Sequence, residues 1–251
     1  MTTWRSWICA AVVLFALVSL GGVLDAGPPE QRSPGTERRL VLPDGRLSGL
    51  SGAYWATALA NGGPAPRHER LLVVMPDGRL LDVIDGERDH VLLPVELSRE
   101  LSQRKLDVAL VHNHPAGVSL SGTDLMHLAK IGVAAVIAIG SEGSVYEASA
   151  GARFDVFDDG LYLGLIRRLQ DRLAREAWRS NEDPGALYQH VPHLAAVVLH
   201  RARVIDYRVV PSLTAHLAFV RYREVLERVA TAEVRRLEQD LTPHGRPPDL
   251  K

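Results

Sequence analysis

Residues 108–124 read VALVHNHPAGVSLSGTD, and this stretch decides both the expected fold class and the candidate chemistry. Val108–Val111 is a short apolar run typical of a buried strand, and His112 and His114 follow it directly. Residues i and i+2 of an extended chain point to the same side. Pro115 favours an extended backbone at the residue before it. We therefore expect both imidazoles on one side of a sheet.

A carboxylate follows the two histidines at a distance that suits a metal site. Asp124 begins a segment that predicts a helix over 125–131, so its side chain can reach back towards the end of the strand. Two imidazoles and one carboxylate are a sufficient protein ligand set for a catalytic zinc ion, with a fourth position open to water. His112, His114 and Asp124 are the predicted ligands.

The same residues also allow other interpretations. A lone HxH pair is most often structural, and Ser121-x-x-Asp124 is also the pattern of a capping box at a helix start. His127 lies three positions after Asp124 on the same helical face, so a zinc geometry that includes His127 is an alternative.

The pattern His112-x-His114-Pro115 followed by Ser121-x-x-Asp124 resembles the HxHP…SxxD motif of the JAMM/MPN metalloprotease family, with its bacterial JAB-like and RadC-like branches. The resemblance spans residues 48–150. It implies that the two histidines and the aspartate hold Zn²⁺ and that Ser121 supports the tetrahedral intermediate. Six residues separate His114 from Ser121, one fewer than is usual in the family, so the shorter loop affects the placement of Ser121 most.

The resemblance also implies a general base, an upstream glutamate at the start of a strand. Glu69 is the matching residue because it follows a predicted helix and opens a predicted hairpin, 43 positions before His112. Glu87, Glu96 and Glu100 compete for this role, but none of them opens a strand after a helix. The implied reaction is hydrolysis of an amide or isopeptide bond in a protein or peptide by a metal-activated water.

The elements around this stretch predict an α/β fold. They are a helix over 50–60, a hairpin over 71–84, a helix over 95–103, and strands over 133–139 and 145–148. From Leu161 onward the pattern becomes that of amphipathic helices, over 161–178, 186–210 and 213–241. We expect an MPN-like mixed sheet flanked by helices over residues 40–155, followed by a helical region over 156–251.

The N-terminus predicts the compartment. Residues 7–24 are apolar and uncharged, with Arg5 before them and Asp25 after them, which places the start in the cytoplasm and exports the rest. As a helix this run is about 27 Å long, close to the roughly 30 Å core of a bilayer. Residues 1–27 are therefore a signal peptide or a membrane anchor, and 28–39 a linker. The protein is expected to be membrane-anchored, periplasmic or extracellular.

Composition narrows the classes of function. The chain has 29 Lys+Arg and 30 Asp+Glu, so it lacks the basic excess typical of nucleic-acid binding. Its single cysteine, Cys9, excludes a disulfide framework and a cysteine metal cluster. Besides a zinc peptidase, two classes remain: a catalytically silent MPN-like binding or scaffold module, and a nuclease of the HNH type. The complete set of predicted ligands argues against the catalytically silent module. The near-neutral net charge and the predicted export argue against the nuclease.

Overall fold

The computed structural model describes residues 68–241 apart from 76–79, 89, 105–106 and 116–118. The predicted signal peptide or anchor, the linker over 28–39 and the helix over 50–60 lie outside these residues. Among the helices of the described residues, none has both the length and the apolar character needed to cross a membrane.

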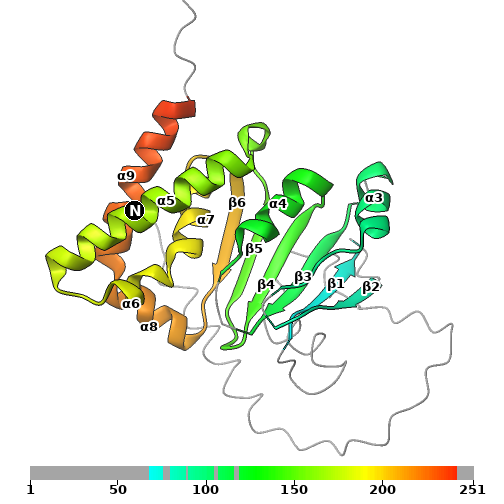
Figure 1. The fold of residues 1–251 in the computed structure, drawn as a ribbon, viewed down its shortest axis with the longest axis horizontal. Coiled ribbons are helices and arrows are strands. Elements are labelled where there is room, and N and C mark those ends of the chain that lie inside the picture. Colours follow the sequence, from blue (N-terminus) through cyan, green and yellow to red (C-terminus); the bar gives the residue numbers. More distant parts are fainter. Residues whose placement is uncertain (1–67, 76–79, 89, 105–106, 116–118, 242–251) are drawn as a thin grey trace, which may run out of the picture. The chain divides into compact units, whose positions relative to one another are not determined.

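The described strands form one six-stranded mixed sheet (Figure 1). In their order across the sheet they are β2 (Leu80–Asp85), β1 (Arg70–Val74), β3 (Ala109–His114), β4 (Ala135–Gly140), β5 (Val145–Ala150) and β6 (Ile205–Val210). β3 and β4 run parallel, and the other neighbouring pairs of this sheet are antiparallel. The expected α/β class with a mixed sheet is confirmed.

Helix α4 (Gly122–Ile131) makes the crossover that the parallel strands β3 and β4 require. A capping box begins it: the Ser121 hydroxyl accepts from the Asp124 N–H, and the Asp124 carboxylate accepts from the Ser121 N–H. Gly132 ends the helix with a φ of 75°, a left-handed conformation that glycine adopts freely because it has no Cβ. The crossover therefore starts with Asp124 close to the end of β3.

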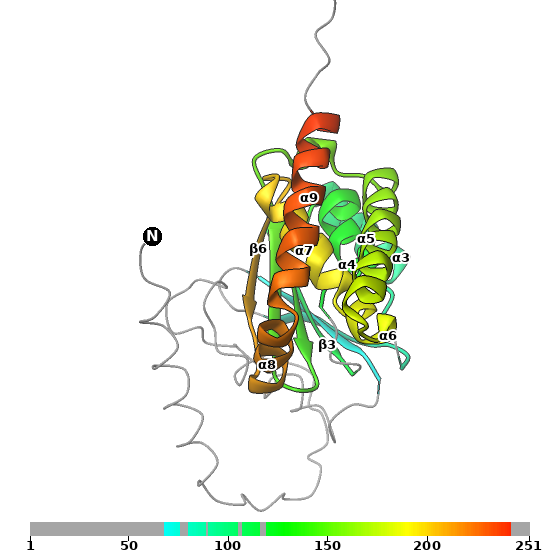
Figure 2. The same cartoon turned by 90° about the vertical axis from the view of Figure 1, so that its left-hand side faces the viewer.

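The other described helices cover one face of the sheet, which is visible edge-on in Figure 2. They are α3 (Val95–Arg104), α5 (Asp159–Ser180), α6 (Pro184–Tyr188), α7 (Val191–Arg201), α8 (Leu213–Arg221) and α9 (Arg223–Leu241), with a short 3-10 turn at Phe154–Val156. Leu71 and Leu110 of the sheet share one buried cluster with Leu165 of α5 and Leu194 of α7. Burial of these apolar side chains holds the helices to the sheet.

Alternation along β3 decides which way the histidines point. Leu110 belongs to the cluster under the helices, whereas Ala109 and Val111 belong to a second cluster on the opposite face. Because successive side chains of a strand alternate between faces, His112 and His114 share the helix-covered face with Leu110.

The region expected to be helical throughout contributes a strand. The helix predicted over 186–210 is instead α6, α7 and then β6, which pairs antiparallel with β5. Ile205 and Tyr207 are buried while Asp206 and Arg208 are exposed, a two-residue alternation that fits a strand covered on one face. The helix predicted over 213–241 is likewise divided, into α8 and α9 at Tyr222. Residues 156–251 are therefore not an all-helical addition, because β6 completes the sheet.

Candidate metal centre

His112 and His114 converge at the end of β3. The strand extends beyond the expected 108–111 and includes both residues, which are 1% and 4% exposed. Their Nε2 atoms are 2.8 Å apart, and the two rings meet edge to face. Two buried ring nitrogens at this separation present their lone pairs or protons to the same small volume.

The Asp124 carboxylate joins the two imidazoles. Its Oδ1 lies 3.0 Å from Nε2 of His112, and its Oδ2 lies 3.4 Å from Nε2 of His114. The same carboxylate accepts the Ser121 N–H at 2.6 Å, so Asp124 acts as a helix cap and contacts both histidines at once. The capping-box interpretation and the metal interpretation of this motif are therefore compatible.

Asp124 is in the ionised state that a metal ligand requires. Burial raises the pKa of Asp124, but the charges and hydrogen bonds of His112 and His114 outweigh burial and hold the pKa well below its ordinary value. The carboxylate is thus ionised at neutral pH. Metal ligands must be deprotonated, so no proton has to be removed from Asp124 before a cation binds.

The pairing of β1 with β3 positions Glu69. Leu71 lies opposite His112 in this antiparallel pair, and continuing the same register by two residues places Glu69 opposite His114. Glu69 is 8% exposed, and its Oε1 lies 4.0 Å from Nε2 of His114. Glu69, His112 and His114 each offer one ligand atom, and these three atoms lie within 4.8 Å of one another.

Asn113 fixes the residues around Glu69, a role that the sequence analysis did not assign. Its Oδ1 accepts the Arg70 N–H at 2.7 Å, and its Nδ2 donates to the His68 carbonyl at 3.1 Å. On the other side, the Glu69 N–H donates to the carbonyl of Glu87. The Asn113 side chain thus bonds to the residues on either side of Glu69, beyond the last backbone pair of β1 and β3, Leu71 and His112. The polar residue between the two histidines was the feature of the sequence that could have indicated this role of Asn113.

The donor set fits a zinc ion. Metal–ligand distances of about 2.0–2.2 Å in a tetrahedral site separate neighbouring ligand atoms by about 3.3–3.6 Å. The separations of 2.8, 3.0 and 3.4 Å among His112, His114 and Asp124 approach that spacing. The Nδ1 of His112 is buried without a hydrogen-bond partner among the described residues, whereas ligand histidines usually donate from their second nitrogen. Nitrogen and carboxylate oxygen donors are those that zinc accepts.

Ser121 lies beside the cluster as a half-buried residue. Its Oγ accepts the Asp124 N–H at 3.2 Å. A hydroxyl has two lone pairs and one proton, so the cap uses a lone pair and leaves the proton to be donated elsewhere. The loop between His114 and Ser121 is one residue shorter than is usual for the motif. The capping box nevertheless holds Ser121 next to Asp124.

The competing residues are not among the converging donors in the described part of the chain. Glu87, Glu96 and Glu100 are all exposed, and Glu100 pairs with Arg104 at 3.1 Å. His127 is half-buried on α4, and burial lowers its pKa below the ordinary value despite the opposing charge of Asp124. It lines a groove of about 480 Å³ next to Thr123 and is not part of the converging donor group within the described part of the chain.

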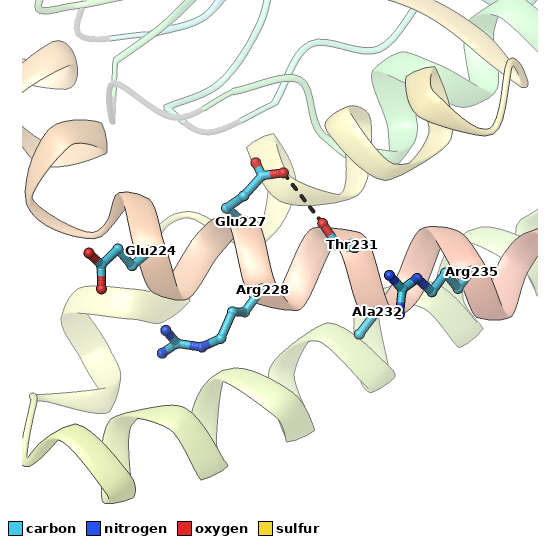
Figure 3. A pocket seen from close by; sticks show the side chains of 6 residues that line it. All are labelled: Glu224, Glu227, Arg228, Thr231, Ala232 and Arg235. Atoms are coloured by element: carbon cyan, nitrogen blue, oxygen red, sulfur yellow. Dashed lines mark hydrogen bonds between the residues drawn. The ribbon is translucent and has the colours of Figure 1, made fainter.

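A second depression lies on the surface of α9 (Figure 3) and carries no comparable chemistry. Its lining residues are Glu224, Glu227, Arg228, Thr231, Ala232 and Arg235. Arg228 pairs with Glu176 at 2.8 Å, and Glu227 pairs with Arg201 at 2.8 Å. The charges of Arg228 and Glu227 are compensated by these ion pairs, which is typical of a solvated helix face.

Comparisons with protein-family models, with curated proteins and with solved structures found no match for this chain. Its class follows from its own fold and site. It is an α/β protein whose mixed sheet carries a buried group, Glu69, His112 and His114, that could hold a metal ion.

Proposed function

We propose that this chain is a zinc-dependent peptidase or isopeptidase of the JAMM/MPN type. The observation that carries the proposal is the convergence of Glu69, His112, His114 and Asp124 at one end of β3. The motif that resembles the family supplies His112, His114 and Asp124, and Glu69 is the upstream glutamate that the same resemblance implies. In this proposal His112, His114 and Asp124 hold the zinc.

When bound, zinc supplies Lewis acidity and makes hydroxide available at neutral pH. Glu69 takes the proton of the attacking water and delivers it to the leaving amine. Its Oε1 lies 4.0 Å from Nε2 of His114, so the carboxylate is next to one of the proposed ligands. The Ser121 hydroxyl donates its proton towards the oxygen of the tetrahedral intermediate, stabilising the developing negative charge.

The proposed substrate is a protein or a peptide rather than a nucleic acid. The chain has a net charge of −1, and the predicted export separates it from DNA. We propose that residues 7–24 carry the rest of the chain out of the cytoplasm, as an anchor or as a cleaved signal. A reporter that is active only after export, fused at position 40, should give a signal; activity of a cytoplasmic reporter alone would contradict this part of the proposal.

The decisive experiment replaces the proposed base. Glu69→Gln keeps the size of the side chain and removes its ability to take a proton. We expect about one zinc per chain, as in the wild type, and a fall of about 10²–10⁴ in the hydrolysis rate of a peptide substrate found by screening. Glu87→Gln is the matched control, because Glu87 is a nearby exposed glutamate whose side chain should not affect the rate.

Each other result has a definite meaning. An unchanged rate in Glu69→Gln would assign the base to another glutamate. Loss of zinc from that variant would make Glu69 a ligand, a role its position near His112 and His114 also allows. A zinc-free wild-type protein that cleaves nothing would favour the catalytically silent module instead.

A further inference from the structure

A third carboxylate next to the proposed metal centre has no hydrogen-bond partner among the described residues. Glu142 lies in the turn between β4 and β5, and as a whole residue it is half-buried. Both of its carboxylate oxygens are nevertheless buried, and neither has a hydrogen-bond partner in the described part of the chain. A buried carboxylate without a hydrogen bond or a counter-charge is costly, so it needs an explanation.

The carboxylate lies over Gly140, the last residue of β4. A Cβ built on Gly140 would collide with both oxygens of Glu142. Gly140 shares its face of β4 with Ala138, which belongs to the cluster under the helices. The Glu142 carboxylate therefore fills the space of the missing side chain on that face.

That face is the one on which the metal centre lies. In the parallel pairing of β3 with β4, Gly140 lies opposite His114, and the Ser141 N–H donates to the His114 carbonyl at 3.1 Å. Paired residues of neighbouring strands stand about 4.8 Å apart. His114 is therefore flanked by Glu69 on the β1 side and by the carboxylate of Glu142 on the β4 side.

We propose that Glu142 forms a subsite for an organic cation, the ammonium or guanidinium group of a substrate bound at the metal centre. This inference rests on the proposed function for the identity of the ligand as substrate. A single carboxylate balances the charge of one ammonium group, whereas a second metal ion would require further donors. With zinc in place, the charges of Asp124 and Glu69 would balance that of the metal, whereas both oxygens of Glu142 lack a hydrogen-bond partner among the residues that the structure describes.

The turn allows this carboxylate to reach a ligand. Glu142 is followed by Gly143, whose φ of 92° closes the turn, and Ser141 before it is exposed. Rotation of the flexible Glu142 side chain away from Gly140 brings the carboxylate out without moving β4. In the free protein the carboxylate folds back over the bare Cα of Gly140.

The test measures equilibrium binding to the full-length, zinc-loaded protein. The probes are N-acetyl-lysinamide, which has only a side-chain ammonium, norleucinamide, which has only an α-ammonium, and N-acetyl-norleucinamide, which is uncharged. We expect one of the two cationic probes to bind on the order of 10-fold more tightly than the uncharged probe. The probe that gains affinity distinguishes a side-chain cation from a chain N-terminus.

Glu142→Gln should remove this preference while zinc content stays unchanged. Gly140→Ala should retain the preference, because its Cβ moves the carboxylate away from Gly140, as ligand binding does, without removing it. Glu147→Gln, which changes a half-buried carboxylate on β5, is the control and should retain the preference. Equal binding of all probes to the wild type, no binding of either cation, or a preference that survives Glu142→Gln would each overturn the proposal. A preference removed by Glu142→Gln supports the subsite even if no peptide is cleaved, so the two proposals fail separately.

Discussion

The hydroxyl groups of Ser119 and Tyr207 are 2.9 Å apart and buried, although 88 positions separate the two residues in the chain. Tyr207 lies on β6, and Ser119 lies between His114 and Ser121. The Tyr207 hydroxyl also lies 2.9 Å from Nδ1 of His193 on α7. The C-terminal part of the chain thus contacts the segment that connects the histidines to Asp124.

Replacing Tyr207 with Phe tests this contact. The ring stays, but the polar groups of Ser119 and His193 lose their shared partner inside the protein. We expect the free energy of unfolding to fall by about 1–3 kcal/mol, measured by urea denaturation. Tyr188→Phe is the control, since Tyr188 is 39% exposed, and it should change the free energy by less than about 0.5 kcal/mol. Equal effects of the two substitutions would show that the buried hydroxyl bonds add nothing.

Alanine at either histidine should abolish zinc binding. His112→Ala and His114→Ala each remove one of three proposed protein ligands, so zinc measured by elemental analysis after dialysis should drop from about one per chain to near zero. His127→Ala is the matched control on the neighbouring helix and should retain zinc. Full zinc content in both of the first two variants would refute the metal centre, and loss of zinc in His127→Ala would favour the alternative geometry.

Breaking the ion pairs between α5 and α9 should greatly reduce the stability of the protein. Glu233 of α9 is fully buried, and its carboxylate accepts from Arg168 at 2.8 Å and also from Arg172. Glu233→Gln leaves both guanidinium groups without a counter-charge. We expect a loss of about 3 kcal/mol in urea unfolding, at the lower end for a broken buried pair because both arginines are partly exposed.

An exposed glutamate of the same helix provides the comparison. Glu227 pairs with Arg201 but its side chain is 57% exposed, so Glu227→Gln should cost about 0–1 kcal/mol. Similar losses in both variants would mean that burial of Glu233 does not strengthen its contribution.

Stability should decrease between pH 6.5 and pH 4. Burial, with a smaller contribution from the charge of His190, lowers the pKa of His193 from 6.5 to about 4. Burial lowers the pKa of His190 as well. In this window the unfolded chain binds more protons than the folded one, so the free energy of unfolding falls as the pH falls. His193 alone accounts for up to about 3 kcal/mol.

Urea unfolding at pH 7 and at pH 4.5 measures this dependence, with a chelator present so that metal binding does not contribute. In His193→Gln the decrease between the two pH values should be smaller than in the wild type. The same decrease in both proteins would show that His193 does not titrate in this window.

Local patterns predicted the elements around the candidate site. The apolar run before His112, the proline after His114 and the capping box at Ser121 each act over a few residues. They therefore predicted a strand, an extended exit and a helix start without knowledge of the rest of the chain. The hairpin, α3, α5 and the strands after α4 were anticipated for the same reason, with ends that differ by a few residues.

The contacts between distant parts of the chain could not be predicted from local sequence patterns. The segment at Ile205–Val210 was assigned to a helix, because its pairing with β5 depends on a partner more than 50 residues earlier in the chain. The position of Glu69 opposite His114 was inferred from a family resemblance, whereas the register of β1 against β3 and the bonds of Asn113 fix it physically.

The sequence by itself predicted His112, His114 and Asp124 as the donor set, and it determined the local conformation that points the two histidines to one side. Only the tertiary structure decided that the turn with Glu142 lies beside His114, and that Tyr207 contacts Ser119. Periodicity and capping are encoded within a turn or two of backbone. Strand register, and the burial of charges that follows from it, depends on contacts between residues far apart in the chain.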